Sequence, residues 1–299
     1  MREISRRDFL KAAIAGGAGI AALQFIGGST LAERNSSPWL EGCQGAFSLT
    51  FDDGSQSQLD IAIPILKEYN LLGTFYINPG GDDWKERLAP WREVAAAGHE
   101  IGNHTINHIC SRNFDWGPNV KTLEATTLDE IEADFLEAER RLRELVPEQP
   151  ARSFCYPCYQ SYVGEGPTRQ SYVPIIARHF PAARGMGEAA NHPKFTDLHY
   201  LTSWTAAGWM SGSQLSGFAE TSAKQGRWGI LTLHGFQKDP APPWTSGSYY
   251  HGSALPSDNF RELCEYLAEN RERIWTAPVV EIAQRIIAWR KDIKTQEEM

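Results

Sequence analysis

Two short motifs carry the side chains with the clearest potential for chemistry. Asp52 and Asp53 follow the apolar run from Gly45 to Phe51, and His104 and His108 lie four residues apart further along the chain. A carboxylate and two imidazoles suit a hydrolytic zinc-type site, in which the ion keeps one position open for water. A second carboxylate beside such a site can act as a general base. The two motifs therefore predict a hydrolytic metal centre.

The residues around both motifs predict strands that end at this centre. Gly45 to Phe51 is apolar and aromatic and stops at Asp-Asp-Gly, which indicates a buried strand running into a turn. Gly98 to Asn103 predicts a second short strand, and the spacing from His104 to His108 suits one helical turn or a tight loop. The alternatives are a solvated turn and a chance histidine spacing. The occurrence of both motifs at strand ends favours the metal centre.

A third histidine also follows a predicted strand. His234 ends the apolar run Gly229 to Leu233, so we expect it at the same edge of the sheet as the two motifs. An imidazole has an ordinary pKa of about 6.5 and can hold and release a proton near neutrality. A hydrogen-bonded core histidine is the alternative interpretation. The shared strand-end position favours a catalytic role.

These motifs, in this order and separation, resemble those of the polysaccharide deacetylase family, the NodB-homology carbohydrate esterases. The segments Thr74 to Ile77, Gly98 to His108 and Leu231 to His234 resemble family segments in family order, so the resemblance extends from Gly45 to the C-terminus. It implies two catalytic residues, Asp52 as the base and His234 as the general acid. It also implies a divalent ion, Zn²⁺ with Co²⁺ or Ni²⁺ as alternatives, whose ligands are Asp53, His104 and His108.

The third family motif differs in this chain. Most members carry an Arg-x-x-Arg-x-Pro-Tyr-like loop whose second arginine holds the catalytic aspartate. Here the segment begins at Arg152 and has Cys155 in the place of that arginine, and a cysteine cannot supply a cationic fork. The resemblance further implies Tyr156 and Pro157 as walls of the substrate groove. It also implies a backbone N–H near Cys158 as an oxyanion donor.

Aromatic loops supply further candidates for substrate binding. The fourth family motif, an aspartate and a tryptophan that tune the acid histidine, has only Asp197 and Trp204 as weak counterparts. The loops Trp204 to Trp209 and Pro240 to Leu255 are rich in aromatic residues, which can stack on sugar rings. Ordinary loop packing is the alternative interpretation of both loops.

The amino terminus resembles a twin-arginine export signal. Ser5 to Lys11 contains the paired arginines, Ala12 to Ile26 is apolar, and small residues permit cleavage after Ala32. A first helix or a membrane anchor is the alternative. However, the apolar run is shorter than the roughly 20 residues that span a bilayer and contains glycines. We therefore expect a signal peptide over residues 1–32, the twin-arginine translocation machinery as partner, and delivery to the periplasm, the cell envelope or the medium. We expect no stable membrane insertion after cleavage. Since this pathway carries folded proteins, the metal could be loaded in the cytoplasm.

Composition agrees with one exported domain over residues 33–299. The 299-residue chain has a formal charge of −8, and removing residues 1–32 leaves 25 basic and 35 acidic residues, a charge of −10. Such an acidic surface argues against nucleic acid or anionic lipid as a partner. The five cysteines leave at least one unpaired. Cys155 and Cys158 could bond to each other, simply pack, or form a redox pair.

Helical patterns alternate with the short strands. Leu59 to Tyr69, Leu128 to Leu145 and Val279 to Trp289 each predict a helix, and the last is expected to close a barrel. This alternation predicts a parallel α/β fold. The family resemblance sharpens the expectation to a TIM-like, distorted (β/α)7 barrel, the NodB-homology domain.

The favoured function is metal-dependent removal of acetyl groups from N-acetylated sugars. The resemblance implies a chitin-, peptidoglycan- or poly-N-acetylglucosamine-like polysaccharide or oligosaccharide as substrate. Hydrolysis of O-acetyl esters on xylan-like glycans is one alternative. A catalytically weak carbohydrate-binding relative is the other, because the third-motif arginine is missing.

Overall fold

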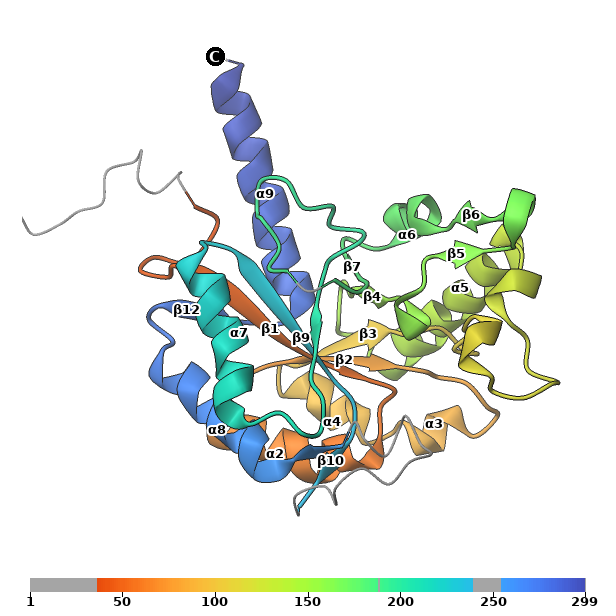
Figure 1. Cartoon of the computed structure of the whole chain (residues 1–299), viewed down its shortest axis with the longest axis horizontal. Helices are drawn as coiled ribbons and strands as arrows, with labels where there is room; N and C mark the ends of the chain where they lie inside the picture. The colour runs from red at the N-terminus through yellow and green to blue at the C-terminus, as the bar shows by residue number, and fades with distance from the viewer. Residues whose placement is uncertain (1–36, 188, 239–253, 299) are drawn as a thin grey trace, which may run out of the picture. The chain divides into compact units, whose positions relative to one another are not determined.

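A parallel sheet organises the computed structural model, which describes residues 37–187, 189–238 and 254–298. The strand order is β7-β4-β3-β2-β1-β9-β8, and β12 pairs with the start of β1. Figure 1 shows β1 and β9 near the middle of this sheet. The strands are β1 (Gly45–Asp52), β2 (Thr74–Ile77), β3 (Glu100–Asn103), β4 (Phe154–Cys155), β7 (Ala183–Arg184), β8 (Trp204–Thr205), β9 (Trp228–Leu233) and β12 (Ile274–Thr276).

Helices and smaller strand pairs surround the sheet. The larger helices are α2 (Ile63–Glu68), α3 (Trp84–Arg87), α4 (Trp91–Ala96), α5 (Leu128–Leu145), α6 (Val173–His179), α7 (Gly212–Lys224), α8 (Ser257–Glu269) and α9 (Val279–Glu297). A π-helical turn, η1 (Gln58–Ala62), precedes α2, and 3₁₀ turns include η4 (Pro157–Tyr159). Two further pairs are β5 (Tyr162–Val163) with β6 (Gln170–Ser171), and β10 (Phe236–Gln237) with β11 (Leu255–Pro256).

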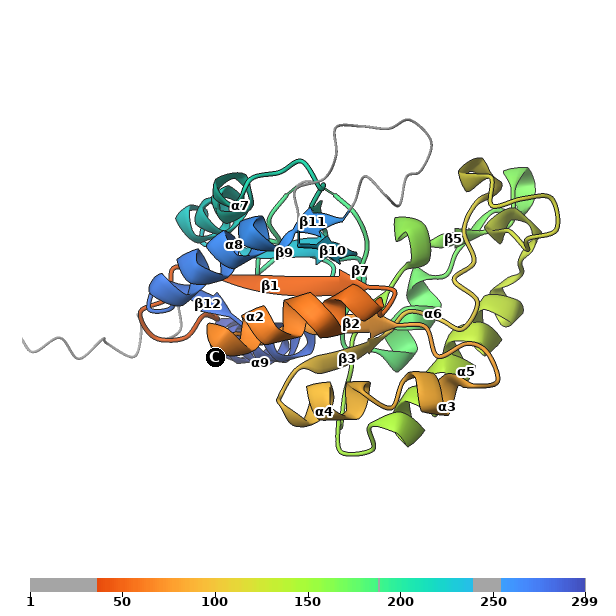
Figure 2. The ribbon, with the colours of Figure 1, turned by 90° about the horizontal axis from the view of Figure 1, so that it is seen from below.

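The two faces of β1 have different chemistry. Phe47, Leu49 and Phe51 alternate along the strand and pack into the main hydrophobic core with residues of α2, α7 and α8. Figure 2 shows α2 and α8 beside β1. Because successive strand residues point to opposite faces, Ser48, Thr50 and Asp52 face the other side. That inner face is polar where β1 ends.

The last helix packs near the starts of the central strands. Val279, Ile282, Ala283 and Ile286 of α9 form a second core with Trp228 of β9 and other buried residues. Apolar side chains therefore cover the end of the sheet where β1 and β9 begin, while polar side chains lie at the end where these strands finish. Among the described residues no helix is both long and apolar enough to cross a membrane.

The predicted fold class is confirmed: seven parallel strands follow one another in the sheet, and β12 adds an eighth beside β1, which is consistent with a distorted, half-barrel form of the (β/α)7 barrel. The predicted helix over Leu128–Leu145 has these bounds in the structure, and a capping box of Thr127 and Glu130 fixes its start. The final helix is longer than predicted and ends at Glu297. Only its first turns bury apolar side chains, so periodicity alone could not locate its end.

Candidate active site

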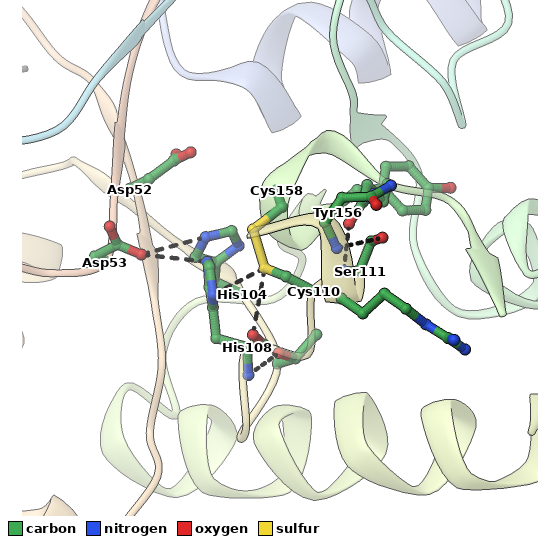
Figure 3. The surroundings of a disulfide bond; sticks show 12 residues. Asp52, Asp53, His104, His108, Cys110, Ser111, Tyr156 and Cys158 are labelled. Atoms are coloured by element: carbon green, nitrogen blue, oxygen red, sulfur yellow. Dashed lines mark hydrogen bonds and ion pairs between the residues drawn. A yellow bond between two sulfur atoms is a disulfide. The ribbon is translucent and has the colours of Figure 1, made fainter. Parts of the chain in front are cut away.

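The end of β1 directs its two aspartates to different places. Asp52 is the last residue of the strand, is 3% exposed and lies on the polar inner face. Asp53 follows with a φ of 72°, a left-handed conformation that is uncommon for a residue other than glycine. This turn brings the Asp53 carboxylate beside the two histidines of the second motif (Figure 3). Adjacent carboxylates therefore occupy separate environments.

Asp53, His104 and His108 form a compact set of metal-ligating atoms. Oδ1 of Asp53 lies 3.5 Å from Nε2 of His104 and 3.5 Å from Nε2 of His108. The edges of a tetrahedral zinc site with nitrogen and oxygen ligands measure about 3.3–3.4 Å, from bond lengths of about 2.0–2.1 Å. Burial, together with the neighbouring His104, lowers the pKa of His108 to about 4, so this ring is neutral at pH 7. The donor set fits a divalent ion.

Hydrogen bonds fix the orientation of the loop that carries the histidines. Nδ1 of His104 lies 3.0 Å from the carbonyl oxygen of Cys155, to which it can donate, leaving Nε2 free to face Asp53. The Asp134 carboxylate of α5 accepts a hydrogen bond of 2.9 Å from the backbone N–H of Ile106. Segment 104–108 is a loop instead of a helical turn, with positive φ at Thr105 and His108.

Asp52 is held by an arginine from the neighbouring part of the sheet. Nη2 of Arg184 donates to Oδ1 of Asp52 at 2.6 Å and also bonds Oδ2, and both side chains are buried. The same guanidinium bonds Thr232 of β9 through Nη1. Arg184 is the direct parallel partner of Cys155 in the pairing of β4 with β7. The cation that holds Asp52 therefore comes from β7, the strand next to β4, where Cys155 stands in place of the family's arginine.

Sequence reasoning missed Arg184. The signal that could have identified it is an arginine after the apolar run Phe180 to Ala183, where a strand would otherwise be uniformly apolar. A buried arginine needs an anionic partner, and Asp52 is that partner.

The charges around Asp52 favour its ionised form. Burial raises the pKa of this carboxyl, but Arg184, His104 and His234 outweigh burial and hold the pKa below its usual range. Burial also raises the pKa of the Cys155 thiol, whose sulfur lies 2.6 Å from Nη2 of Arg184. Cys155 is therefore a neutral neighbour of an ion pair formed by Asp52 and Arg184.

His234 faces the same carboxylate from the end of β9. Its Nε2 lies 3.8 Å from Oδ2 of Asp52, and its side chain is 24% exposed. The Gln58 amide donates to the carbonyl oxygens of Asp52, at 2.6 Å, and His234, at 2.9 Å, which ties the two strand ends together. Nδ1 of His234 is buried and has no hydrogen-bond partner among the described residues. Asp197, the weak fourth-motif candidate, instead bonds the backbone N–H of His199 at 2.9 Å.

Several predicted substrate contacts lie elsewhere. Tyr156 is fully buried, its hydroxyl donates to the carbonyl oxygen of His199 at 2.7 Å, and Pro157 is also buried. Both side chains therefore pack under the surface, and their predicted contact with a substrate stays a prediction. The Trp204 ring stacks on Phe218 of α7 with centroids 5.0 Å apart, which ties it to that helix. Trp209 is 64% exposed, and most of the predicted loop Pro240 to Leu255 lies outside the described residues.

One disulfide lies beside the site. Cys158 forms a disulfide with Cys110, two residues after His108, whereas Cys43, Cys155 and Cys264 are free. The open question about Cys155 and Cys158 is thus answered, since they do not bond to each other. The disulfide joins the histidine loop to the 3₁₀ turn η4 (Figure 3).

Comparisons with known proteins agree with this arrangement. Residues 41–162 match the family model described as polysaccharide deacetylase, and residues 3–22 match the twin-arginine translocation signal sequence. The amino terminus is therefore an export signal. The proposed cleavage after Ala32 lies outside the described residues.

Two curated relatives share part of the chain. A chitooligosaccharide deacetylase from Sinorhizobium fredii (strain NBRC 101917 / NGR234) is 31% identical over 105 residues, which are 35% of this chain and 42% of that protein. A gellan lyase from a Bacillus species is 33% identical over 70 residues, 23% of this chain and 3% of the lyase. The chain thus spans less than half of the length of either relative.

A solved structure supports the fold. The crystal structure of a candidate polysaccharide deacetylase from Mycobacterium smegmatis superposes with a TM-score of 0.52 at 17% identity. The match covers 84% of this chain and 92% of the other. At this identity the likeness concerns the fold alone.

Proposed function

We propose that this chain, whose residues 41–162 match the polysaccharide deacetylase family model, removes acetyl groups from N-acetylated sugars. The substrate class is a chitin-, peptidoglycan- or poly-N-acetylglucosamine-like polysaccharide or oligosaccharide. One observation carries the proposal. A compact set of metal-ligating atoms, from Asp53, His104 and His108, and an arginine-held carboxylate, Asp52, lie side by side at the end of β1.

The proposed metal centre uses Asp53, His104 and His108. The ion in this proposal is Zn²⁺, with Co²⁺ or Ni²⁺ as alternatives, because imidazole and carboxylate ligands suit all three. When bound, the ion would polarise the acetyl carbonyl and make water easier to deprotonate.

Asp52 is the proposed general base. It lies next to the ligand Asp53 in sequence, but its carboxylate is held by Arg184 and so is kept ionised and oriented. An ionised carboxylate can take the proton of an attacking water. Arg184 is therefore a positioning residue, which acts through Asp52 without touching the substrate.

His234 is the proposed general acid. An imidazolium can give a proton to the departing amine, which leaves poorly as an anion. The position of Nε2 at 3.8 Å from Asp52 allows the base and the acid to act on the same small volume. The backbone N–H near Cys158 remains our candidate oxyanion donor, because the disulfide holds its turn beside the histidine loop.

Hydrolysis of O-acetyl esters on xylan-like glycans is the second candidate. One observation favours it. Nδ1 of His234 has no hydrogen-bond partner within the described ranges, so no neighbouring group there supports the protonated ring that a general acid needs. An alcohol leaves more easily than an amine, so an ester needs the acid less. The ion pair of Asp52 and Arg184 argues against the other alternative, a catalytically weak carbohydrate-binding relative, since it supplies the cation that β4 lacks.

Acetate release from chito-oligosaccharides tests the proposed function. We expect release that stops when a chelator removes the metal and returns when Zn²⁺ or Co²⁺ is added. Acetylated xylan, assayed in parallel, separates the amide from the ester. Full release by metal-free protein would contradict the proposal, and release from xylan alone would favour the ester.

A further inference from the structure

His108 lies between two different sets of ligand atoms. Its Nε2 is 3.5 Å from Oδ1 of Asp53, and its Nδ1 is 3.5 Å from Sγ of Cys110 (Figure 3). A neutral imidazole carries a proton on one ring nitrogen and a free lone pair on the other. The ring can therefore bind one metal ion at a time, either through Nε2 or through Nδ1.

The second set consists of Nδ1 of His108 and the sulfurs of Cys110 and Cys158. These ligand atoms all lie within 4.8 Å of one another. In a tetrahedral zinc site with two thiolates and one imidazole, the sulfur–nitrogen edge measures about 3.6 Å and the sulfur–sulfur edge about 3.8 Å. Cys110 and His108 already have this separation, at 3.5 Å. The two sulfurs, bonded in the disulfide, must move apart to reach it, and Sγ of Cys158 lies within 4.8 Å of Nδ1 of His108.

The folded chain passes through conditions in which these sulfurs are thiols. Residues 3–22 match the twin-arginine signal, and that pathway carries proteins that have already folded. The cytoplasm keeps cysteines reduced, whereas exported proteins meet oxidising conditions. The domain therefore folds first with Cys110 and Cys158 reduced and close together, and Zn²⁺ and similar ions prefer thiolate over carboxylate ligands.

We propose that the reduced protein has a second metal site, formed by Cys110, Cys158 and Nδ1 of His108, and that disulfide formation abolishes it. An oxidant of the disulfide class takes two electrons from the two thiolates, which form the Cys110–Cys158 bond, while the oxidant becomes two thiolates. The ion loses its sulfur ligands and leaves. His108 then presents Nε2 to Asp53, so the two sites exclude each other. This exclusion rests on the metal centre proposed above, but the thiolate site does not.

Cobalt absorption tests the proposal on the full chain after metal removal. Thiolate ligands give Co²⁺ an intense sulfur-to-metal charge-transfer band, which nitrogen and oxygen ligands do not. We expect this band when Co²⁺ is added to protein reduced with a phosphine, and no band with the oxidised protein. The Cys110→Ser/Cys158→Ser double variant should lose the band under reducing conditions. Cys43→Ser is the matched control, since Cys43 is a free cysteine elsewhere in the chain, and it should keep the band.

Two outcomes would overturn the proposal. One is reduced wild-type protein that binds Co²⁺ without the charge-transfer band, a comparison that needs no substitution and no refolding. The other is a band that persists in the double variant but disappears in Cys155→Ser, which would assign the thiolate to Cys155. The absorption experiment does not depend on acetate release. Loss of the band with a normal nitrogen–oxygen cobalt spectrum would therefore leave the proposed deacetylase centre standing.

Discussion

The two halves of the candidate site are built in different ways. In the β1–β3–β9 half, each polar side chain follows directly after the strand that carries it, as Asp53, His104 and His234 do. In the β4–β7 half, the cation that holds Asp52 comes from Arg184, which stands beside Cys155 on the next strand. In the first half, the place of each side chain depends on its position along its own strand. In the second half, the contact of Arg184 with Asp52 depends on how β4 and β7 pair.

This difference shows that the positive charge beside Asp52 can be supplied from a different position in the sequence and still lie at the same position in the fold. Side chains at paired positions of neighbouring parallel strands lie close together on one face of the sheet. An arginine on β7 can therefore reach the carboxylate that an arginine on β4 would otherwise reach. The missing residue in one segment did not imply a missing interaction.

The largest effect is expected from the proposed metal ligands in the first half. Asp53→Ala, His104→Ala and His108→Ala should each weaken metal binding by more than about 100-fold and leave no measurable deacetylation. Metal content after dialysis, measured by atomic emission, checks this. Asp82→Asn, an exposed aspartate on another loop, is the matched control and should keep its metal. Retention of the ion by all three alanine variants would move the metal centre elsewhere.

The proposed general acid in the same half, His234, should show a smaller and substrate-dependent effect. His234→Ala should lower kcat/KM for an N-acetylated sugar by about 10²–10⁴-fold, because the amine needs a proton to leave. Hydrolysis of an activated aryl acetate, whose leaving group departs unprotonated, should fall much less. Both substrates are assayed with each protein. Equal losses for the two would argue against an acid role.

In the second half, Arg184→Met should reduce turnover by about 10–100-fold, the range for partners that orient a functional group. It should also lower the free energy of unfolding by about 3–5 kcal/mol, since Asp52 would remain buried without its partner. Arg184 lowers the pKa of Asp52 and burial raises it. The variant should therefore need a higher pH to ionise Asp52, and the acidic limb of kcat/KM should move to higher pH.

Arg152→Met is the matched control for this variant. Arg152 is also buried and pairs with Glu139 at 2.9 Å, away from Asp52. Its loss should destabilise the fold but leave the acidic limb where it is. An unchanged pH profile in Arg184→Met would mean that Arg184 stabilises the fold without tuning Asp52. Arg184→Lys, which keeps the charge with fewer donors, should lie between wild type and Arg184→Met.

The smallest effect is expected at Cys155. Its neutral thiol touches Arg184 but carries no charge, and serine keeps a hydrogen-bond acceptor of smaller size. Cys155→Ser should change kcat/KM only a few-fold and leave the acidic limb in place. Comparison of its pH profile with that of wild type checks this. A collapse of activity would give Cys155 a function beyond packing against the ion pair.

The sequence predicted the first half well because strand periodicity and strand-end position are local properties. The start of β1, the end of β9 and the bounds of α5 could all be obtained from short windows of sequence. The role of Arg184 could not be predicted in this way, because β7 is only two residues long and Arg184 reaches Asp52 only through the pairing of β7 with β4. The burial of Tyr156 and the bond between Cys110 and Cys158 are likewise long-range results.

The central claim is that Asp52 and Asp53, adjacent in sequence, perform different tasks because the chain turns after the end of β1 and points their carboxylates in different directions. The most direct test measures metal content and acetate release on one sample of Asp52→Asn. The amide cannot accept the proton of water, so we expect a full complement of metal together with a loss of turnover of about 10²–10⁴-fold. Metal loss equal to that of Asp53→Ala, or turnover equal to that of wild type, would contradict the claim.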